Sequence, residues 1–249
     1  MLIDTHCHIH EPDYTLDIAE TLVRAKDAGV TQYLCVGTSE ESSRQAIEFA
    51  EEHEGCVASI GVHPHDTKGG YSDIAKLAST SNKIVAIGEI GLDYFYTNSP
   101  KEVQLQALRD QLNVAVERNL PVIFHVRDAF EDFWPILDRY PQIRGVLHSY
   151  TDSQANLDEA INRGLYIGVN GISTFTKDPI QQAMFDAIPL DKMLLETDAP
   201  FLTPHPYRGT VNEPAYVSTI AEFHANRRGT SATEIAKATT HNARELFAI

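Results

Sequence analysis

The sequence predicts a TIM-like (β/α)8 barrel, a fold in which eight parallel strands alternate with helices. Three observations predict it: eight short apolar runs recur along the chain, longer amphipathic segments separate them, and the 249 residues match the size of such a domain. An open doubly wound sheet is the structural alternative. Neither a GxGxxG nor a GxxxxGK[ST] motif follows any of the apolar runs, so no nucleotide-binding fingerprint supports it.

The eight apolar runs are short, rich in β-branched residues and almost continuously apolar, as expected for parallel strands buried on both faces. They are Leu2–His6, Gln32–Val36, Val57–Val62, Ile84–Ile90, Val122–Val126, Gly145–His148, Leu165–Val169 and Lys192–Glu196.

Helix start signals stand out in two of the intervening segments. Ser99–Glu102 reads as a capping box with proline at the first helical position, and the helix should end before Pro121. Ser231–Glu234 is a second capping box and should open the last helix.

Composition indicates a single domain over residues 1–249, in a soluble, cytoplasmic protein. Hydrophobic residues make up 43% of the chain, no linker or composition shift marks a boundary, and three cysteines without a CxxC pair favour a reducing compartment. We find neither a signal peptide nor an apolar stretch long enough to cross a membrane. The net charge of −15 argues against binding through the phosphate backbone, unless metal ions supply local positive charge.

Metal-binding side chains stand at the carboxyl ends of the predicted strands, where a barrel assembles its active site. Each HxH pair occupies alternate positions of an extended segment, so its two imidazoles project to the same side and can share an ion. Imidazoles combined with carboxylates suit Zn²⁺, Mn²⁺ or similar ions. The candidates are His6, His8, His63, His65, Glu89, His125, His148 and Asp198.

In these motifs the chain resembles TatD-type metal-dependent deoxyribonucleases of the amidohydrolase superfamily. The resemblance begins at residue 3, runs to about residue 214, and includes the C-terminal segment with Asn242. The matching motifs are DTHCHIH, GVHPH, GEIGLDY, PVIFHVR, LHSY, ETDAP, Pro206–Gly209 and Asn212–Pro214.

The resemblance implies two divalent ions, which we expect to be Zn²⁺, Mg²⁺ or Mn²⁺, with Glu89 bridging them. The implied ligands are His6, His8, Glu89 and Asp198 for one ion, and Glu89, His125 and His148 for the other.

The resemblance also implies the activity of a 3′–5′ exonuclease that cleaves phosphodiester bonds of a nucleic acid, for which we expect single-stranded DNA. A hydroxide activated by the two ions would attack phosphorus. The expected catalytic residues are Asp198 and Glu89, and the expected substrate-binding residues are His63, His65, Arg127 and Arg208.

Two rival functions stay open. The same metal site could attack a carbonyl carbon, as in a deacylase, amidase or lactonase, for instance a d-aminoacyl-tRNA deacylase. The other rival is a metal-stabilised binding protein without turnover. Such a protein should have lost at least one ligand, whereas every matched ligand position is filled here. The residues alone also leave open the native metal, the choice between exonuclease and endonuclease and its polarity, the choice between DNA and RNA, and the oligomeric state.

Overall fold

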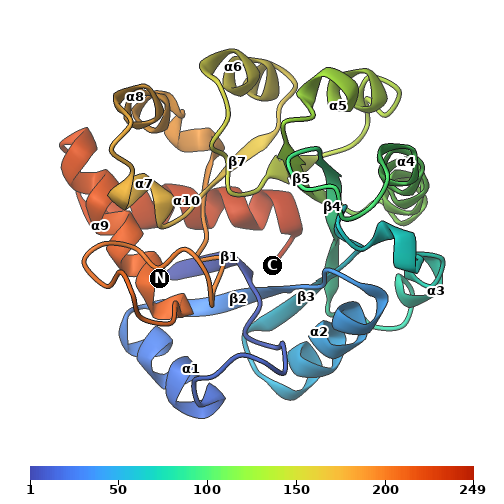
Figure 1. Cartoon of the computed structure of the whole chain (residues 1–249). Coiled ribbons are helices and arrows are strands. Elements are labelled where there is room, and N and C mark those ends of the chain that lie inside the picture. Colours follow the sequence, from blue (N-terminus) through green and yellow to red (C-terminus); the bar gives the residue numbers. More distant parts are fainter. The chain divides into compact units, whose positions relative to one another are not determined.

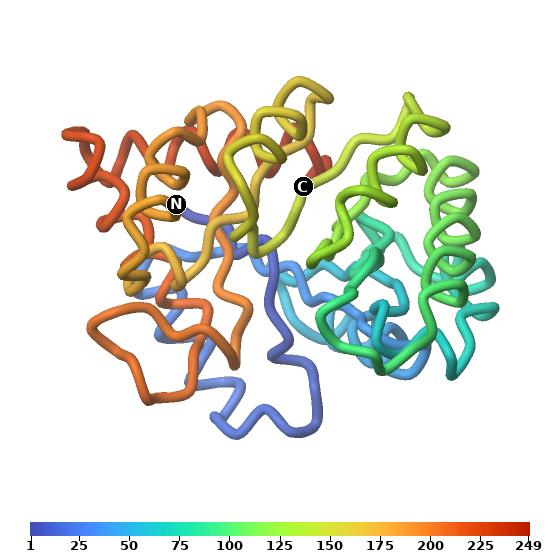
Figure 2. Tube along the Cα trace, turned by 45° about the horizontal axis from the view of Figure 1, so that its top comes forward, coloured from blue at the N-terminus to red at the C-terminus, as the bar shows by residue number.

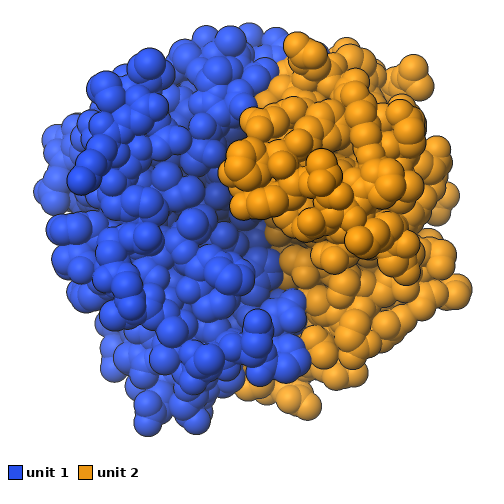
Figure 3. Space-filling view, viewed as in Figure 1, with its two compact units in different colours: residues 1–35, 148–249 blue, residues 36–147 orange.

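The computed structural model describes residues 1–249, which form two compact units. Figure 3 colours them separately. Unit 1 comprises Met1–Cys35 and His148–Ile249, and unit 2 comprises Val36–Leu147. The expectation of a single domain over residues 1–249 stays a prediction.

Eight strands follow one another in the sheet in chain order, and every strand pair whose register is described is parallel. The predicted (β/α)8 fold is confirmed, and each strand lies within a few residues of its predicted range. The strands are β1 Leu2–Cys7, β2 Val30–Val36, β3 Cys56–Ile60, β4 Ile84–Asp93, β5 Val122–Arg127, β6 Gly145–Leu147, β7 Tyr166–Val169 and β8 Met193–Leu195.

Helices alternate with the strands along the chain (Figure 1). Three short 3₁₀ turns accompany them, at Thr67–Gly69, Leu190–Lys192 and Pro214–Tyr216. The helices are α1 Ile18–Asp27, α2 Glu40–Glu52, α3 Ile74–Leu77, α4 Lys101–Arg118, α5 Phe130–Leu137, α6 Gln154–Asn162, α7 Ile172–Phe175, α8 Pro179–Ala187, α9 Val217–Arg228 and α10 Ala232–Phe247. None of them combines the length and apolarity that a membrane span requires.

In unit 1 the last helix, α10, packs against the first strand, β1, and against β8. Figure 2 traces the chain from its N-terminus in blue to its C-terminus in red. The Thr240 hydroxyl donates to the carbonyl of Met1 at 3.1 Å. The Asn242 amide donates to the carbonyls of Leu190 and Met193 at 2.9 and 2.8 Å. Since these carbonyls precede and begin β8, α10 fixes the strand that leads to the site described below.

Helix α4 positions the end of β3 in unit 2. The buried Gln111 side chain accepts a hydrogen bond from the Val62 N–H at 2.8 Å and donates one to the Val62 carbonyl at 3.3 Å. A side-chain amide thus satisfies both backbone groups of a residue just beyond the strand, which a buried segment requires. The backbone that leads into His63 is held in place as a result.

One of the two predicted capping boxes is wrong. Helix α4 begins at Lys101 with Pro100 as its N-cap, and no side chain caps it. The Ser99 hydroxyl instead donates to the His65 carbonyl at 2.7 Å and accepts from the Lys68 N–H at 3.1 Å. The second box is confirmed at α10, where Ser231 accepts from the Glu234 N–H at 3.1 Å.

Candidate metal sites

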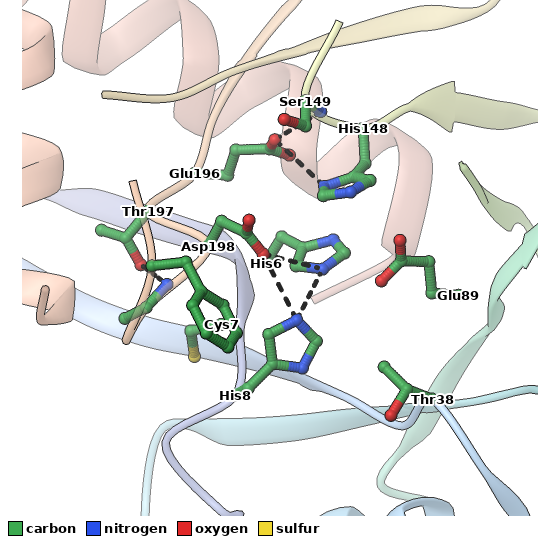
Figure 4. A network of polar contacts seen from close by, with 12 residues as sticks. His6, Cys7, His8, Thr38, Glu89, His148, Ser149, Glu196, Thr197 and Asp198 are labelled. Atoms are coloured by element: carbon green, nitrogen blue, oxygen red, sulfur yellow. Dashed lines mark hydrogen bonds and ion pairs between the residues drawn. The ribbon is translucent and has the colours of Figure 1, made fainter. Parts of the chain in front are cut away.

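The first group of donor atoms lies in unit 1, where β1 ends next to the segment that follows β8 (Figure 4). The Nε2 atoms of His6 and His8 are 3.2 Å apart. Asp198 Oδ1 is 3.6 Å from His6 Nε2 and 3.3 Å from His8 Nε2. The donor atoms of these three residues therefore converge on one point.

The spacing of these atoms fits a shared metal ion. Two ligands of a tetrahedral ion with metal–ligand distances of about 2.1 Å lie about 3.4 Å apart. The observed separations of 3.2–3.6 Å bracket this value. Two imidazoles and a carboxylate also form a donor set that Zn²⁺ and Mn²⁺ accept. The residues present thus fit the group that the motifs imply.

Backbone contacts hold Asp198 in position. Its N–H donates to the His6 carbonyl at 2.8 Å, and the His8 N–H donates to the Ala199 carbonyl at 2.7 Å. Asp198 adopts φ of 59°, a left-handed conformation that non-glycine residues rarely adopt. The Asn212 amide donates to the Thr197 carbonyl at 2.8 Å and so anchors the same segment from the other side.

The carboxylate of Asp198 is kept ionised. Burial raises its pKa, but the hydrogen bond from His8 and the nearby His148 and His6 imidazoles lower it more strongly, and the pKa lies below its usual value. An ionised carboxylate is the form that binds a cation or accepts a proton.

His148 belongs to the same unit and stacks on His6, with ring centroids 3.8 Å apart and an interplanar angle of 16°. Its Nδ1 is 3.3 Å from Glu196 Oε1, the same oxygen that accepts the Ser149 N–H at 2.6 Å. A carboxylate behind an imidazole fixes the orientation of the ring and raises its basicity as a ligand. Glu196 therefore orients His148.

Asp4 plays a structural role that the sequence analysis did not single out. Its carboxyl group is fully buried and accepts hydrogen bonds from the Thr197 N–H at 2.9 Å, the Thr197 hydroxyl at 2.5 Å and the His6 N–H at 3.3 Å. Burial raises its pKa to about 8, and the Thr197 hydrogen bonds offset part of the effect. The sequence signal that could have revealed this role is a charged residue, Asp4, within the apolar run Leu2–His6.

The second group of donor atoms lies in unit 2. Glu89 Oε1 is 2.8 Å from His125 Nδ1 and 3.4 Å from His63 Nε2, and the donor atoms of all three residues lie within 4.8 Å of one another. Glu89 and His125 were expected to be ligands, whereas His63 was expected to contact substrate. The structure places His63 among the potential ligands, with the same type of donor set as in unit 1.

Asp93 supports this second group. Its Oδ2 is 3.1 Å from His125 Nε2 and 2.8 Å from His65 Nε2. Burial raises the pKa of Asp93, but the hydrogen bonds from His125, from the Tyr96 N–H and from His65 outweigh it, and the pKa lies well below its usual value. His65, predicted to bind substrate, is thus tied to an ionised carboxylate that also orients His125.

Arg127 and Arg208 are exposed, and neither forms a salt bridge. In unit 2 the Arg127 guanidinium lies over the Phe95 ring, 3.9 Å from its centroid. In unit 1 the Arg208 guanidinium lies 4.0 Å from the Phe175 ring centroid and donates to the Thr203 carbonyl at 2.9 Å. Both positive charges remain available to an anionic ligand.

The family model described as TatD-related DNase matches residues 3–248, nearly the whole chain. The chain belongs to the TatD family. It is 40% identical to the "uncharacterized metal-dependent hydrolase YabD" of Bacillus subtilis (strain 168), over all of both chains. It is 35% identical to the "3'-5' ssDNA/RNA exonuclease TatD" of Citrobacter rodentium (strain ICC168), covering 100% of this chain and 98% of that protein.

Among solved structures, the crystal structure of YJJV, a TatD homologue from Escherichia coli K12, superimposes with a TM-score of 0.92. It is 30% identical, and the match covers 100% of this chain and 98% of that chain. This likeness confirms the TIM-like fold over the whole length. Together the comparisons identify the chain as a metal-dependent hydrolase of the TatD family, and therefore as an enzyme.

Proposed function

We propose that this enzyme is a nuclease that hydrolyses single-stranded DNA from the 3′ end, with divalent ions held by His6, His8 and Asp198 and by His63, Glu89 and His125. The observation that carries the proposal is the unpaired guanidinium of Arg127, two residues beyond His125 on β5. A free, forked cation beside a metal-binding group suits a phosphodiester, whose oxygens accept a bidentate contact.

The relatives support the same chemistry. The Citrobacter rodentium protein, 35% identical over the full length, is named as an exonuclease of single-stranded DNA and RNA. Every motif quoted above for the resemblance lies inside the matched range of 3–248.

Different residues of the chain contribute to different parts of the reaction. When bound, divalent ions would supply a hydroxide nucleophile near neutral pH and would neutralise charge on the phosphoryl group. Asp198, held ionised, orients the attacking water and accepts its proton. Glu89 faces both His63 and His125 and would hold an ion together with them. Arg127 of unit 2 and Arg208 of unit 1 each offer a guanidinium that can bind phosphoryl oxygens and stabilise the charge that builds up on them.

Hydrolysis of end-labelled single-stranded DNA tests this proposal. Purified enzyme is incubated with 3′- or 5′-labelled strands in Mg²⁺, Mn²⁺ or Zn²⁺, and in parallel with EDTA. We expect a ladder of 5′-labelled products that shortens from the 3′ end, and no products with EDTA. Products that shorten from the 5′ end would refute the stated polarity.

No cleavage of DNA or RNA by metal-loaded enzyme would overturn the nuclease proposal. Aryl ester, lactone and d-aminoacyl-tRNA substrates in the same assay then decide whether the site attacks a carbonyl carbon. The ligand groups serve either reaction, so this outcome would change the substrate and leave the metal sites in place.

A further inference from the structure

Two aromatic side chains are exposed next to the metal-binding group of unit 2. Phe95 and Tyr96 lie two and three residues beyond the end of β4, and 54% and 46% of their surfaces are exposed. Their ring centroids are 4.8 Å apart, with an interplanar angle of 81°. Two neighbouring large rings that the fold leaves in solvent form a patch of the kind that marks a binding surface.

The backbone that carries these rings is held firmly. Asp93 Oδ1 accepts the N–H of Phe95 at 2.9 Å and the N–H of Tyr96 at 3.0 Å. Gln104 of α4 accepts the Asp93 N–H at 2.9 Å and donates to the Asp93 carbonyl at 3.0 Å. A rigid aromatic surface loses little entropy when a ligand binds to it.

The same carboxylate connects the rings to the metal-binding group. While Oδ1 of Asp93 holds the two N–H groups, its Oδ2 faces His125 Nε2 at 3.1 Å and His65 Nε2 at 2.8 Å. The His65 ring also meets the Tyr96 ring edge to face, 5.2 Å between centroids. Tyr96 therefore contacts His65, and Asp93 links His65 to His125, a proposed metal ligand.

A cation and a cavity complete the surface. The Arg127 guanidinium lies 3.9 Å from the Phe95 ring centroid and 5.2 Å from that of Tyr96, and it forms no salt bridge. Beside Tyr96 a cavity of about 370 Å³, within the range of small-ligand sites, is bounded by Thr97, Ser99 and Lys101 among others.

We propose that Phe95 and Tyr96 stack against bases of the single strand while Arg127 contacts an adjacent phosphate. The inference rests on the proposed nuclease function and adds to it the way in which the strand is held. Aromatic rings stack on any base, so the contact requires no particular sequence.

The charge of the protein explains why such a contact is needed. With a net charge of −15, the enzyme cannot rely on counterion release to hold a polyanion. Stacking does not depend on charge and persists at salt concentrations that screen phosphate contacts. A surface for another protein chain would not require a guanidinium without a salt bridge beside the rings, which favours a nucleic acid.

The test compares a single-stranded oligonucleotide with a strand of equal length whose terminal nucleotides carry tetrahydrofuran in place of base and sugar. We expect the unmodified enzyme to prefer the base-bearing strand by about tenfold in kcat/KM. In the Phe95→Leu/Tyr96→Leu variant the preference should disappear, chiefly through a higher KM for the base-bearing strand.

Two controls separate ring stacking from loss of structure. The exchange Phe95→Tyr/Tyr96→Phe keeps both rings and should keep the preference. Ile180→Ala removes another exposed apolar side chain, 76% exposed on α8, and should leave activity unchanged. Melting temperatures verify that each variant is folded.

The possible outcomes distinguish the two proposals. An unmodified enzyme that cleaves neither strand contradicts the nuclease function itself. Cleavage of both strands at equal rates overturns the stacking inference but leaves the nuclease function standing. The stacking inference is equally overturned if the leucine variant keeps the full preference, or if it changes only the oligomeric state in sedimentation, which would make the rings a subunit contact.

Discussion

The backbone of Gly168 on β7 leaves no room for a side chain beneath the Glu196 carboxylate. A Cβ atom at residue 168 would clash with Glu196 Oε2 and would lie 2.8 Å from its Cδ. Only glycine allows Glu196 to reach both His148 and the Ser149 N–H. The orientation of His148, a metal ligand implied by the family resemblance, thus depends on the absence of a side chain at Gly168 on β7.

We expect Gly168→Ala to weaken metal binding, because the added methyl group displaces Glu196 and leaves His148 without its orienting carboxylate. Loss of such a partner lowers metal affinity by about 10- to 100-fold. Titration with Mn²⁺ by calorimetry measures the change. Gly69→Ala is the matched control, since no atom lies within 4 Å of its added Cβ. Equal affinities of the two variants would contradict the role of Glu196.

We expect Asp198→Asn to lower turnover by about 10²- to 10⁴-fold, because an amide cannot accept the proton of the attacking water. The measurement is kcat on labelled single-stranded DNA at saturating Mn²⁺, together with the metal content of the variant. Glu245→Gln removes an exposed carboxylate of α10 and serves as the control for net charge. Undiminished turnover of Asp198→Asn would refute its assignment as the proton acceptor.

Divalent ions should stabilise the folded enzyme, because the converging donors exist only in the native state. At a free concentration 100 times the dissociation constant, one bound ion adds about 2.7 kcal/mol to the free energy of unfolding. Differential scanning calorimetry with Mn²⁺ and with EDTA measures the shift in Tm. His6→Asn/His8→Asn should reduce this shift, and His241→Asn, an exposed histidine of α10, should not. A shift that survives in the double variant would place the stabilising ion elsewhere.

His224 should make the stability of the enzyme depend on pH. It is fully buried in α9, with Nε2 3.0 Å from the Ser173 hydroxyl. Burial, and secondly the charge of Arg228, lower its pKa from 6.5 to about 4. The folded state therefore binds fewer protons than the unfolded state. The contribution of His224 to stability is complete above pH 6.5 and is lost as the pH falls towards 4, by about 3 kcal/mol.

Urea unfolding at pH 7.5 and pH 4.5 measures this loss. We expect His224→Gln, which keeps a donor for Ser173 but does not titrate, to lose less stability between these pH values than the unmodified enzyme does. Carboxylates titrate in both proteins. The difference between the two losses of unfolding free energy from pH 7.5 to pH 4.5 therefore isolates the contribution of the histidine. Identical losses in the two proteins would show that His224 does not cause the pH dependence of stability.

The positions of the strands, and of donor side chains at their ends, could be predicted because both depend on local pattern. A continuous apolar run such as Val122–Val126 identifies a buried parallel strand by its composition alone. The alternation of His6 and His8 places both imidazoles on one side of β1 wherever that strand lies. The capping box at Ser231 was confirmed for the same reason, since its partner is three residues away.

Contacts between distant residues were decided by the tertiary structure. The Ser99 hydroxyl does not cap α4 as expected but donates to the His65 carbonyl, 34 residues away. His63 joined Glu89 and His125 because parallel pairing aligns the ends of three strands. Asp4 gained its hydrogen bonds from Thr197, 193 residues along the chain. The sequence by itself therefore determined which residues form strands and which donors stand at strand ends, since neighbouring residues set both. Only folding decided which distant partner each donor meets, because strand register and the burial around a side chain arise from the whole structure.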